Sequence, residues 1–250
     1  MSFALINLLK ILSLTKLSVN INKIATLRNS RGGSEPNVVD FAIDIQSFGA
    51  DGITVHPRPD ERHIKYDDVY ALKNEVYTEF NIEGNPIDKF MKLVIDIQPT
   101  QVTLVPDKVD AITSNSGWNT VEYKNMLKDI INELKSYDIR TSIFLDPETK
   151  YIDSLLEINP DRVELYTEEF AKEFLIGNFS IIEKYQVCAD KISKEGIGVN
   201  AGHDLSLKNI KYFANNIGNL LEVSIGHALI TESLYYGLEK TIKKYLHFLS

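Results

Sequence analysis

The sequence is poor in cysteine: Cys188 is the only one among 250 residues. A single cysteine excludes a disulfide framework and a cysteine-based zinc site, and it fits the reducing conditions of the cytoplasm. Positive charge is also scarce, because 27 Lys and Arg residues stand against 35 Asp and Glu residues, for a net charge of -8. A bulk nucleic-acid binder normally carries the opposite sign. We therefore expect a cytoplasmic protein that does not bind nucleic acid.

Long apolar runs are missing as well. A membrane-spanning helix needs about 20 apolar residues, whereas the apolar stretch at residues 1–15 is shorter and is interrupted by Asn7 and Lys10. The stretch has neither a basic start nor a small-residue cleavage site, so we do not interpret it as a targeting segment. We interpret residues 1–15 as a dispensable N-terminal extension or as a start assigned too early, with Leu14 as the alternative start. We expect no membrane association.

From residue 16 onward, short β-branched runs alternate with longer amphipathic stretches, a pattern typical of βα units around a parallel sheet. The expected strands are 17–21, 52–56, 79–83, 101–105, 140–145, 162–166, 196–200 and 222–225. The expected helices between and after them are 37–48, 67–76, 86–97, 120–136, 147–158, 180–194, 207–217 and 228–237. Eight strands with eight helices are the elements of a closed (β/α)8 barrel.

An open, doubly wound sheet is the competing architecture. It would need a glycine-rich nucleotide-binding turn after its first strand, but residues 20–23 read Asn-Ile-Asn-Lys, and the chain has no Walker A motif. No linker or composition break divides the chain. The sequence therefore predicts an α/β fold with a single (β/α)8 TIM barrel over residues 16–250. An additional helix, 238–249, is expected outside the ring, in a position suited to an oligomer interface.

Histidines gather at the predicted strand ends. Catalytic groups of such barrels lie at the carboxyl ends of the strands, and four of the five histidines fall there: His56, His63, His203 and His227. A single histidine is more often a packed or solvated residue than a functional one, but four at one rim favour a site.

Two carboxylates accompany these histidines. Glu83 ends the third predicted strand, where burial would require a partner and would raise its pKa toward the range useful for proton transfer. Glu164 lies within the sixth strand, and its side chain points either into the barrel mouth or outward to the helices. The inward orientation is the one that we favour.

Two features predict anion binding. Gly226 and His227 open the helix expected after strand eight, where exposed backbone N–H groups and the helix dipole favour a phosphate. Segments 28–33 and 56–63, expected as arginine-bearing loops after strands one and two, would hold a second anion through bidentate contacts. The alternative is that these arginines form surface ion pairs with Asp60 and Glu61. The aperiodic segment 106–119 has the length of a lid, and its Thr113 and Ser114 could hold a substrate oxygen.

Several segments, in chain order from about residue 16 to the C-terminus, resemble the pyridoxine 5'-phosphate synthase family. They are residues 20–32, 49–64, 81–83, 104–106, 200–203 and 225–228. The resemblance implies a (β/α)8 enzyme of vitamin B6 biosynthesis, a transferase that joins 3-amino-2-oxopropyl phosphate to 1-deoxy-D-xylulose 5-phosphate. The products would be pyridoxine 5'-phosphate, phosphate and water. It further implies no metal or organic cofactor, a homo-octamer and a cytoplasmic location.

The resemblance also assigns roles to individual residues. His56, Glu83 and His203 would be the acid–base residues, and Glu164 would stabilise a transition state. The deoxyxylulose phosphate would be held by Asn22, Lys23, Arg58, His63 and Thr113. The amino-ketone phosphate would be held by Asn20, Arg31 and the turn formed by Gly226 and His227. Asp204, beside His203, is a further candidate substrate-binding residue with no substrate assigned to it.

The sequence departs from the family pattern at two places, and two alternative functions stay open. Many members have Asp-His where this chain has Asn22 and Lys23, and often have Gly where this chain has Asp204. One alternative is a barrel isomerase or aldolase that acts on a single sugar phosphate, with a divalent metal at His56, Glu83 and His203. Another is a phosphate-ligand binder in which these substitutions have disabled catalysis.

Overall fold

The chain forms a closed barrel of eight parallel strands, shown in a computed structural model that describes residues 14–106 and 116–250. The strands are β1 (Lys16–Asn20), β2 (Gly52–Val55), β3 (Glu79–Gly84), β4 (Gln101–Leu104), β5 (Arg140–Leu145), β6 (Arg162–Tyr166), β7 (Gly198–Gly202) and β8 (Leu220–Ile225). Each strand pairs with the next, and β1 closes the barrel by pairing with β8. The predicted (β/α)8 fold is confirmed.

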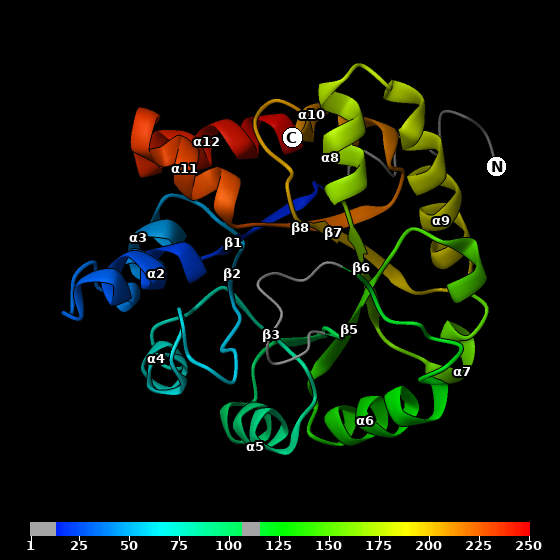
Figure 1. Cartoon of the computed structure of the whole chain (residues 1–250), viewed down its shortest axis with the longest axis horizontal. Helices are drawn as coiled ribbons and strands as arrows, with labels where there is room; N and C mark the ends of the chain where they lie inside the picture. Colours follow the sequence, from blue (N-terminus) through cyan, green and yellow to red (C-terminus); the bar gives the residue numbers. More distant parts are fainter. Residues whose placement is uncertain (1–13, 107–115) are drawn as a thin grey trace.

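Helices surround the barrel (Figure 1). They are α2 (Asn22–Arg31), α3 (Val38–Ser47), α4 (Tyr66–Leu72), α5 (Asp88–Ile97), α6 (Lys124–Ser136), α7 (Leu155–Ile158), α8 (Glu168–Leu175), α9 (Ile182–Lys194), α10 (Ile210–Asn216), α11 (His227–Tyr236) and α12 (Leu238–Leu249). Two short 3-10 helices, η1 (Thr149–Tyr151) and η2 (Phe179–Ile181), precede α7 and α9. None of the helices in the described ranges combines the length and apolar character that a membrane span requires.

The structure corrects three local predictions. Residues 28–31, expected within an arginine-bearing loop, belong to α2, and α8 was not predicted at all. The helix expected over 147–158 is instead the 3-10 turn η1 followed by the single turn α7. Helix 238–249 is confirmed as α12, which packs outside the ring against α10, α3 and β1. Its proposed role in an oligomer interface stays a prediction.

The core lies between the strands and the helices. Outward-facing strand residues such as Leu17, Ile53, Ile82 and Val163 are fully buried against the helical layer. Because side chains alternate across a strand, the residues between them point into the barrel, and these are largely polar. Ser18 and Thr54, for example, share a hydrogen bond of 2.7 Å across β1 and β2. This interior differs from the branched apolar filling usual in such barrels.

The segment of residues 1–13 lies outside the described residues, so its interpretation as an extension stays a prediction. The described chain begins at Leu14, which is exposed. Thr15 donates a hydrogen bond of 3.0 Å to the carbonyl of Leu220 at the start of β8.

Candidate active site

A pocket of about 580 Å³ opens at the carboxyl ends of the strands. Twelve of the fourteen sequence-predicted site residues line it: Asn20, Asn22, Lys23, His56, Arg58, His63, Glu83, Glu164, His203, Asp204, Gly226 and His227. The remaining lining residues are Thr26, Arg62, Tyr166, Glu168, Leu205, Ser224 and Ala228. The four histidines predicted at the rim therefore share one pocket. The fifth, His247, lies on α12.

His56 and Glu83 face each other from the ends of β2 and β3. The Nδ1 atom of His56 lies 3.8 Å from Oε2 of Glu83, and both side chains are buried. Burial lowers the pKa of His56 well below its usual value, and the charges of Arg58, His63, His203 and Arg62 lower it further. The imidazole is therefore neutral near pH 7 and able to accept a proton.

Glu164 points into the barrel, as favoured from the sequence. Its side chain is 1% exposed, and its Oε1 atom has no hydrogen-bond partner among the described residues. Burial raises the pKa of Glu164 well above its usual range, and the nearby carboxyl groups of Glu83 and Glu222 raise it further. These surroundings favour the protonated form of the carboxyl group, which can donate a hydrogen bond into the pocket.

His203 is positioned between two aromatic rings. Its ring centroid lies 4.8 Å from that of Phe144 and 5.2 Å from that of Tyr166, and its Nδ1 atom lies 4.0 Å from Oε1 of Glu164. His203 and Asp204 both have left-handed backbone conformations, with φ of 79° and 57°. Such backbone costs about 1–3 kcal/mol per residue and persists where its surroundings enforce it. Here the hydroxyl of Thr167 donates to the carbonyl of Gly202 at 2.7 Å and also contacts that of His203.

The predicted anion site after strand eight is present in the fold. Gly226 is the N-cap of α11, and its cap has no side-chain hydrogen bond. Gly226, His227 and Ala228 line the pocket, so the amino end of a ten-residue helix faces it. Unpaired N–H groups and the helix dipole suit this end to a phosphate.

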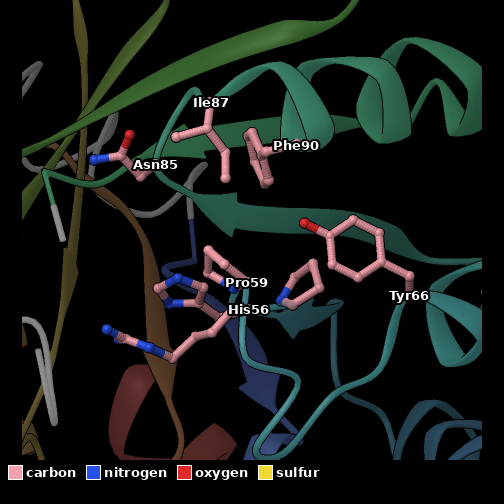
Figure 2. Close-up of a pocket in the computed structure, with 8 residues that line it drawn as sticks. His56, Pro59, Tyr66, Asn85, Ile87 and Phe90 are labelled. Carbon is pink, nitrogen blue, oxygen red and sulfur yellow. The ribbon is translucent and has the colours of Figure 1, made fainter. Parts of the chain in front are cut away.

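Apolar side chains lie behind the segment that carries His56 and Arg58, across a small cavity. Figure 2 shows His56 and Pro59 on one side of a small cavity, with Ile87 and Phe90 on the opposite side and Tyr66 beside them. A Cβ atom on Gly84 would lie 2.2 Å from the ring of Phe90, so glycine is required there for this packing. Pro57 and Pro59 flank Arg58 and restrict its backbone. Arg58 is 3% exposed and faces the main pocket.

The other arginines differ from the prediction of two arginine-bearing loops. Arg28 makes a two-pronged ion pair with Asp68 of α4, including a contact of 2.8 Å, and so serves the packing of α2 on α4. Arg62 lines the pocket but also pairs with Asp60 at 3.3 Å, the surface pairing considered as the alternative. Arg31, the last residue of α2, is exposed and does not line the pocket, so its assigned role stays a prediction.

Thr113 and Ser114 lie outside the described residues, as does most of the segment interpreted as a lid. The end of that segment is described from residue 116 onward. The indole N–H of Trp118 donates to the carbonyl of Leu104 at 3.0 Å, and the ring is buried. Trp118 therefore anchors the returning chain against the end of β4.

Sequence reasoning missed a charged network at the opposite end of the barrel. Lys16 and Arg140 pair with Glu79, and Glu222 lies 3.7 Å from Arg162 and accepts a hydrogen bond of 3.4 Å from Asn200. Although burial opposes it, hydrogen bonds from Arg140 and Lys16 lower the pKa of Glu79 to about 2. Burial and the charge of Glu79 raise the pKa of Glu222 to about 7. The sequence did carry a signal for this network, because polar residues occupy every second position in the strands.

Glu222→Gln should change how stability depends on pH. The pKa of Glu222 is raised from 4.5 to about 7 in the folded state. The protonated Glu222 side chain therefore contributes fully to the unfolding free energy at low pH, and this contribution is lost as pH rises through about 7. Between pH 5 and 8 the wild type should lose on the order of 2 kcal/mol of unfolding free energy more than the variant, which cannot ionise. Urea denaturation of both proteins at the two pH values measures this. Equal losses in the two proteins would contradict the assignment.

Comparison with known proteins decides the family. The family model "Pyridoxal phosphate biosynthesis protein PdxJ" matches residues 17–250. The chain belongs to this family. It is 60% identical over 236 residues to the pyridoxine 5'-phosphate synthase of Christiangramia forsetii, covering 94% of this chain and 100% of that protein. It is 55% identical to the enzyme of the same name from Flavobacterium johnsoniae, over 93% of this chain and 98% of that one. The resemblance inferred from the motifs is confirmed, and the chain is an enzyme.

Solved structures with little sequence similarity share the PdxJ-family barrel. The 3-keto-L-gulonate-6-phosphate decarboxylase of Vibrio cholerae matches with a TM-score of 0.65 at 8% identity, covering 95% of this chain and 98% of that chain. A phosphoribosylanthranilate isomerase from Thermotoga maritima matches with a TM-score of 0.59 at 11% identity, covering 94% and 98%. At such identities the likeness concerns the fold alone.

Proposed function

We propose that this PdxJ-family protein is a pyridoxine 5'-phosphate synthase that condenses 3-amino-2-oxopropyl phosphate with 1-deoxy-D-xylulose 5-phosphate and releases phosphate and water. The observation that carries the proposal is the composition of one pocket. It places acid–base groups (His56, Glu83, His203 and Glu164) between a cationic wall and the amino end of α11. A reaction of two phosphorylated substrates needs two anion sites around groups that transfer protons.

His56 and Glu83 would transfer protons in the first condensation. The amine of one substrate attacks the ketone carbon of the other, a C–N bond forms, and loss of water gives an imine. The amine must lose protons and the leaving hydroxyl must gain one. A neutral His56 accepts a proton, and the carboxylate of Glu83, 3.8 Å away, takes part in the exchange.

Glu164 and His203 would act on the later eliminations and ring closure. A protonated Glu164 offers a hydrogen bond to oxygen that gains negative charge, which stabilises the transition state without placing a second anion beside the phosphates. His203, held between Phe144 and Tyr166, presents its imidazole to the same volume and would serve as acid for a departing group.

The two phosphorylated substrates would bind on opposite sides of these groups. We assign the deoxyxylulose phosphate to Asn22, Lys23, Arg58, His63 and Thr113. Burial and the charges of Arg58, Arg62 and Lys23 lower the pKa of His63 to about 4, so His63 is a neutral ligand there. We assign the amino-ketone phosphate to Asn20, Arg31, Gly226 and His227, and we keep Asp204, which lines the same pocket, as a substrate-binding candidate without an assigned substrate. The reaction as proposed needs no metal or organic cofactor, and we place the enzyme in the cytoplasm as a homo-octamer.

Product formation tests this function. The purified chain is incubated with both phosphates, with and without EDTA, and pyridoxine 5'-phosphate and inorganic phosphate are quantified. We expect both products in equal amounts, with no loss in EDTA and no product when either substrate is omitted. Binding of both substrates without product would contradict the proposal and would favour the phosphate-ligand binder.

Arg58→Ala should weaken binding of one substrate selectively. A buried guanidinium that contacts a phosphate contributes a charge-assisted hydrogen bond of about 1.5–3 kcal/mol, or about 10–100-fold in affinity. We expect KM for deoxyxylulose phosphate to rise by that factor. KM for the amino-ketone phosphate, which serves as the internal control, should change little. Steady-state kinetics with each substrate varied in turn provide the measurement. A selective rise in KM for the amino-ketone phosphate would contradict the assignment and would mean that the two phosphate sites must be exchanged.

A further inference from the structure

The ends of β1, β2 and β3 are joined by a ring of polar contacts. The backbone N–H of His56 donates to Oδ1 of Asn22 at 2.9 Å, and the N–H of Asn22 donates to Oδ1 of Asn20 at 3.0 Å. The side-chain Nδ2 of Asn20 then donates to Oε2 of Glu83 at 3.4 Å. The same carboxylate oxygen lies 3.8 Å from Nδ1 of His56, which closes the ring.

The amide orientation of Asn20 follows from this ring. Its oxygen must accept from the N–H of Asn22, which is the first residue of α2, so its NH₂ group faces Glu83. Asn20 is also held from the other side, because a Cβ atom on Gly226 would lie 3.2 Å from its Cβ atom. The side chain is therefore fixed between the amino end of α2, the α11 turn and Glu83.

The side chain of Asn22 contacts a different member of the ring, the backbone of His56. Its side-chain oxygen is engaged by the N–H of His56, the residue that directly follows the last residue of β2. Without this acceptor, the buried N–H of His56 would lose its partner and the imidazole would lose one of its restraints. An aspartate at this position would offer an equivalent accepting oxygen.

We propose that Asn20 and Asn22 are positioning residues that fix the distance between His56 and Glu83, in addition to any contact with substrate. This inference rests on the proposed function only for its kinetic readout. The amide of Asn22 supplies the accepting oxygen that the ring requires.

The test compares Asn22→Leu, Asn22→Asp and a matched control, Asn37→Leu. Asn37 likewise accepts a backbone N–H at 2.9 Å, from Val39 at the start of α3, but does not line the pocket. We expect Asn22→Leu to lower kcat about 10–100-fold, because small misplacements of catalytic groups have effects of this size. Asn22→Asp should recover about tenfold of that loss. Asn37→Leu should lower the melting temperature and leave kcat unchanged.

The pH profile separates positioning from binding. The charged and titratable groups facing His56 are Glu83 from β3, His203 from the loop after β7, and Arg58, Arg62 and His63 from its own loop. A carboxylate in Asn22→Asp adds one negative charge to this set, so the low-pH limb of the kcat profile should shift to higher pH. A purely binding role predicts instead a raised KM for deoxyxylulose phosphate with kcat and the pH profile unchanged, and that result would overturn the proposal.

A measurement without substrates keeps this inference separate from the proposed function. The imidazole signals of the free enzyme, labelled with ¹³C-histidine, are followed by NMR against pH, and the His56 signal is assigned by its loss in His56→Gln. We expect the His56 titration to change in Asn22→Leu and Asn22→Asp and to stay the same in Asn37→Leu. If the wild type forms no product, the proposed function is wrong, but the His56 titration still tests the positioning role. An unchanged His56 titration in both Asn22 variants would overturn the positioning role.

Discussion

Glu83→Gln should lower kcat by about 10²–10⁴-fold, the range typical for loss of a general acid–base group. Glutamine preserves the size of the side chain and can still accept the hydrogen bond from Asn20. It cannot take up or release the proton that the carboxylate exchanges beside His56, 3.8 Å away. The loss should therefore fall on turnover, with both KM values changing far less.

Steady-state kinetics at saturating substrate concentrations measure this effect. Glu183→Gln is the matched control, because Glu183 is exposed on α9 and lies outside the pocket. Its kcat should equal that of the wild type, and the melting temperatures of all three proteins should agree closely. Near-normal turnover in Glu83→Gln would remove Glu83 from the acid–base set.

The barrel and its rim were predictable because both depend on local patterns. Each β-branched run marked a strand, and the rule that function lies at the carboxyl ends of barrel strands placed Glu83 and His203 in one pocket. The inward orientation of Glu164 follows from the same pattern. Val163 and Leu165 are apolar neighbours that face the helices, so the residue between them must face the interior.

The helices that were missed differ in the signals they carry. α2 has no apolar stripe, since its buried residues are only Ile24, Ala25 and Arg28, so periodicity could not reveal it. α8 did carry a signal: Glu168 and Glu169 in its first turn, followed by Phe170 and Phe174 four residues apart. Helix α8 was not predicted because only one helix was expected after each strand.

Pairings between distant residues were beyond local reasoning. Arg28 looked like an anion ligand because its sequence neighbours are basic and polar, yet its partner is Asp68, forty residues away. The bond from the His56 backbone to Asn22 spans thirty-four residues in the same way. Contacts of this kind depend on the register between neighbouring strands and loops, which one sequence without its fold does not specify.

Gly202→Ala should disable the enzyme through Glu164. A Cβ atom at position 202 would lie 2.1 Å from Oε1 of Glu164 and 3.3 Å from the carbonyl oxygen of Ser224. Since Glu164 is buried, its carboxyl group can yield only by moving out of its place in the pocket. We expect kcat/KM to fall about 10²-fold, as displacements of about 1 Å at a catalytic group do. Overpacking should also cost about 1–3 kcal/mol of unfolding free energy.

A double-mutant cycle decides whether the effect runs through Glu164. In a Glu164→Ala background the steric conflict is absent, so adding Gly202→Ala should cost clearly less unfolding free energy than it costs in the wild type. Gly218→Ala is the control for glycine replacement in general, because a Cβ atom there meets nothing within 4 Å. Equal costs of Gly202→Ala in the two backgrounds would show that the backbone of β8, not the Glu164 carboxyl group, resists the added methyl group. The glycine at the end of β7 would then serve strand packing, and the placement of Glu164 would have to depend on its neighbours across the barrel.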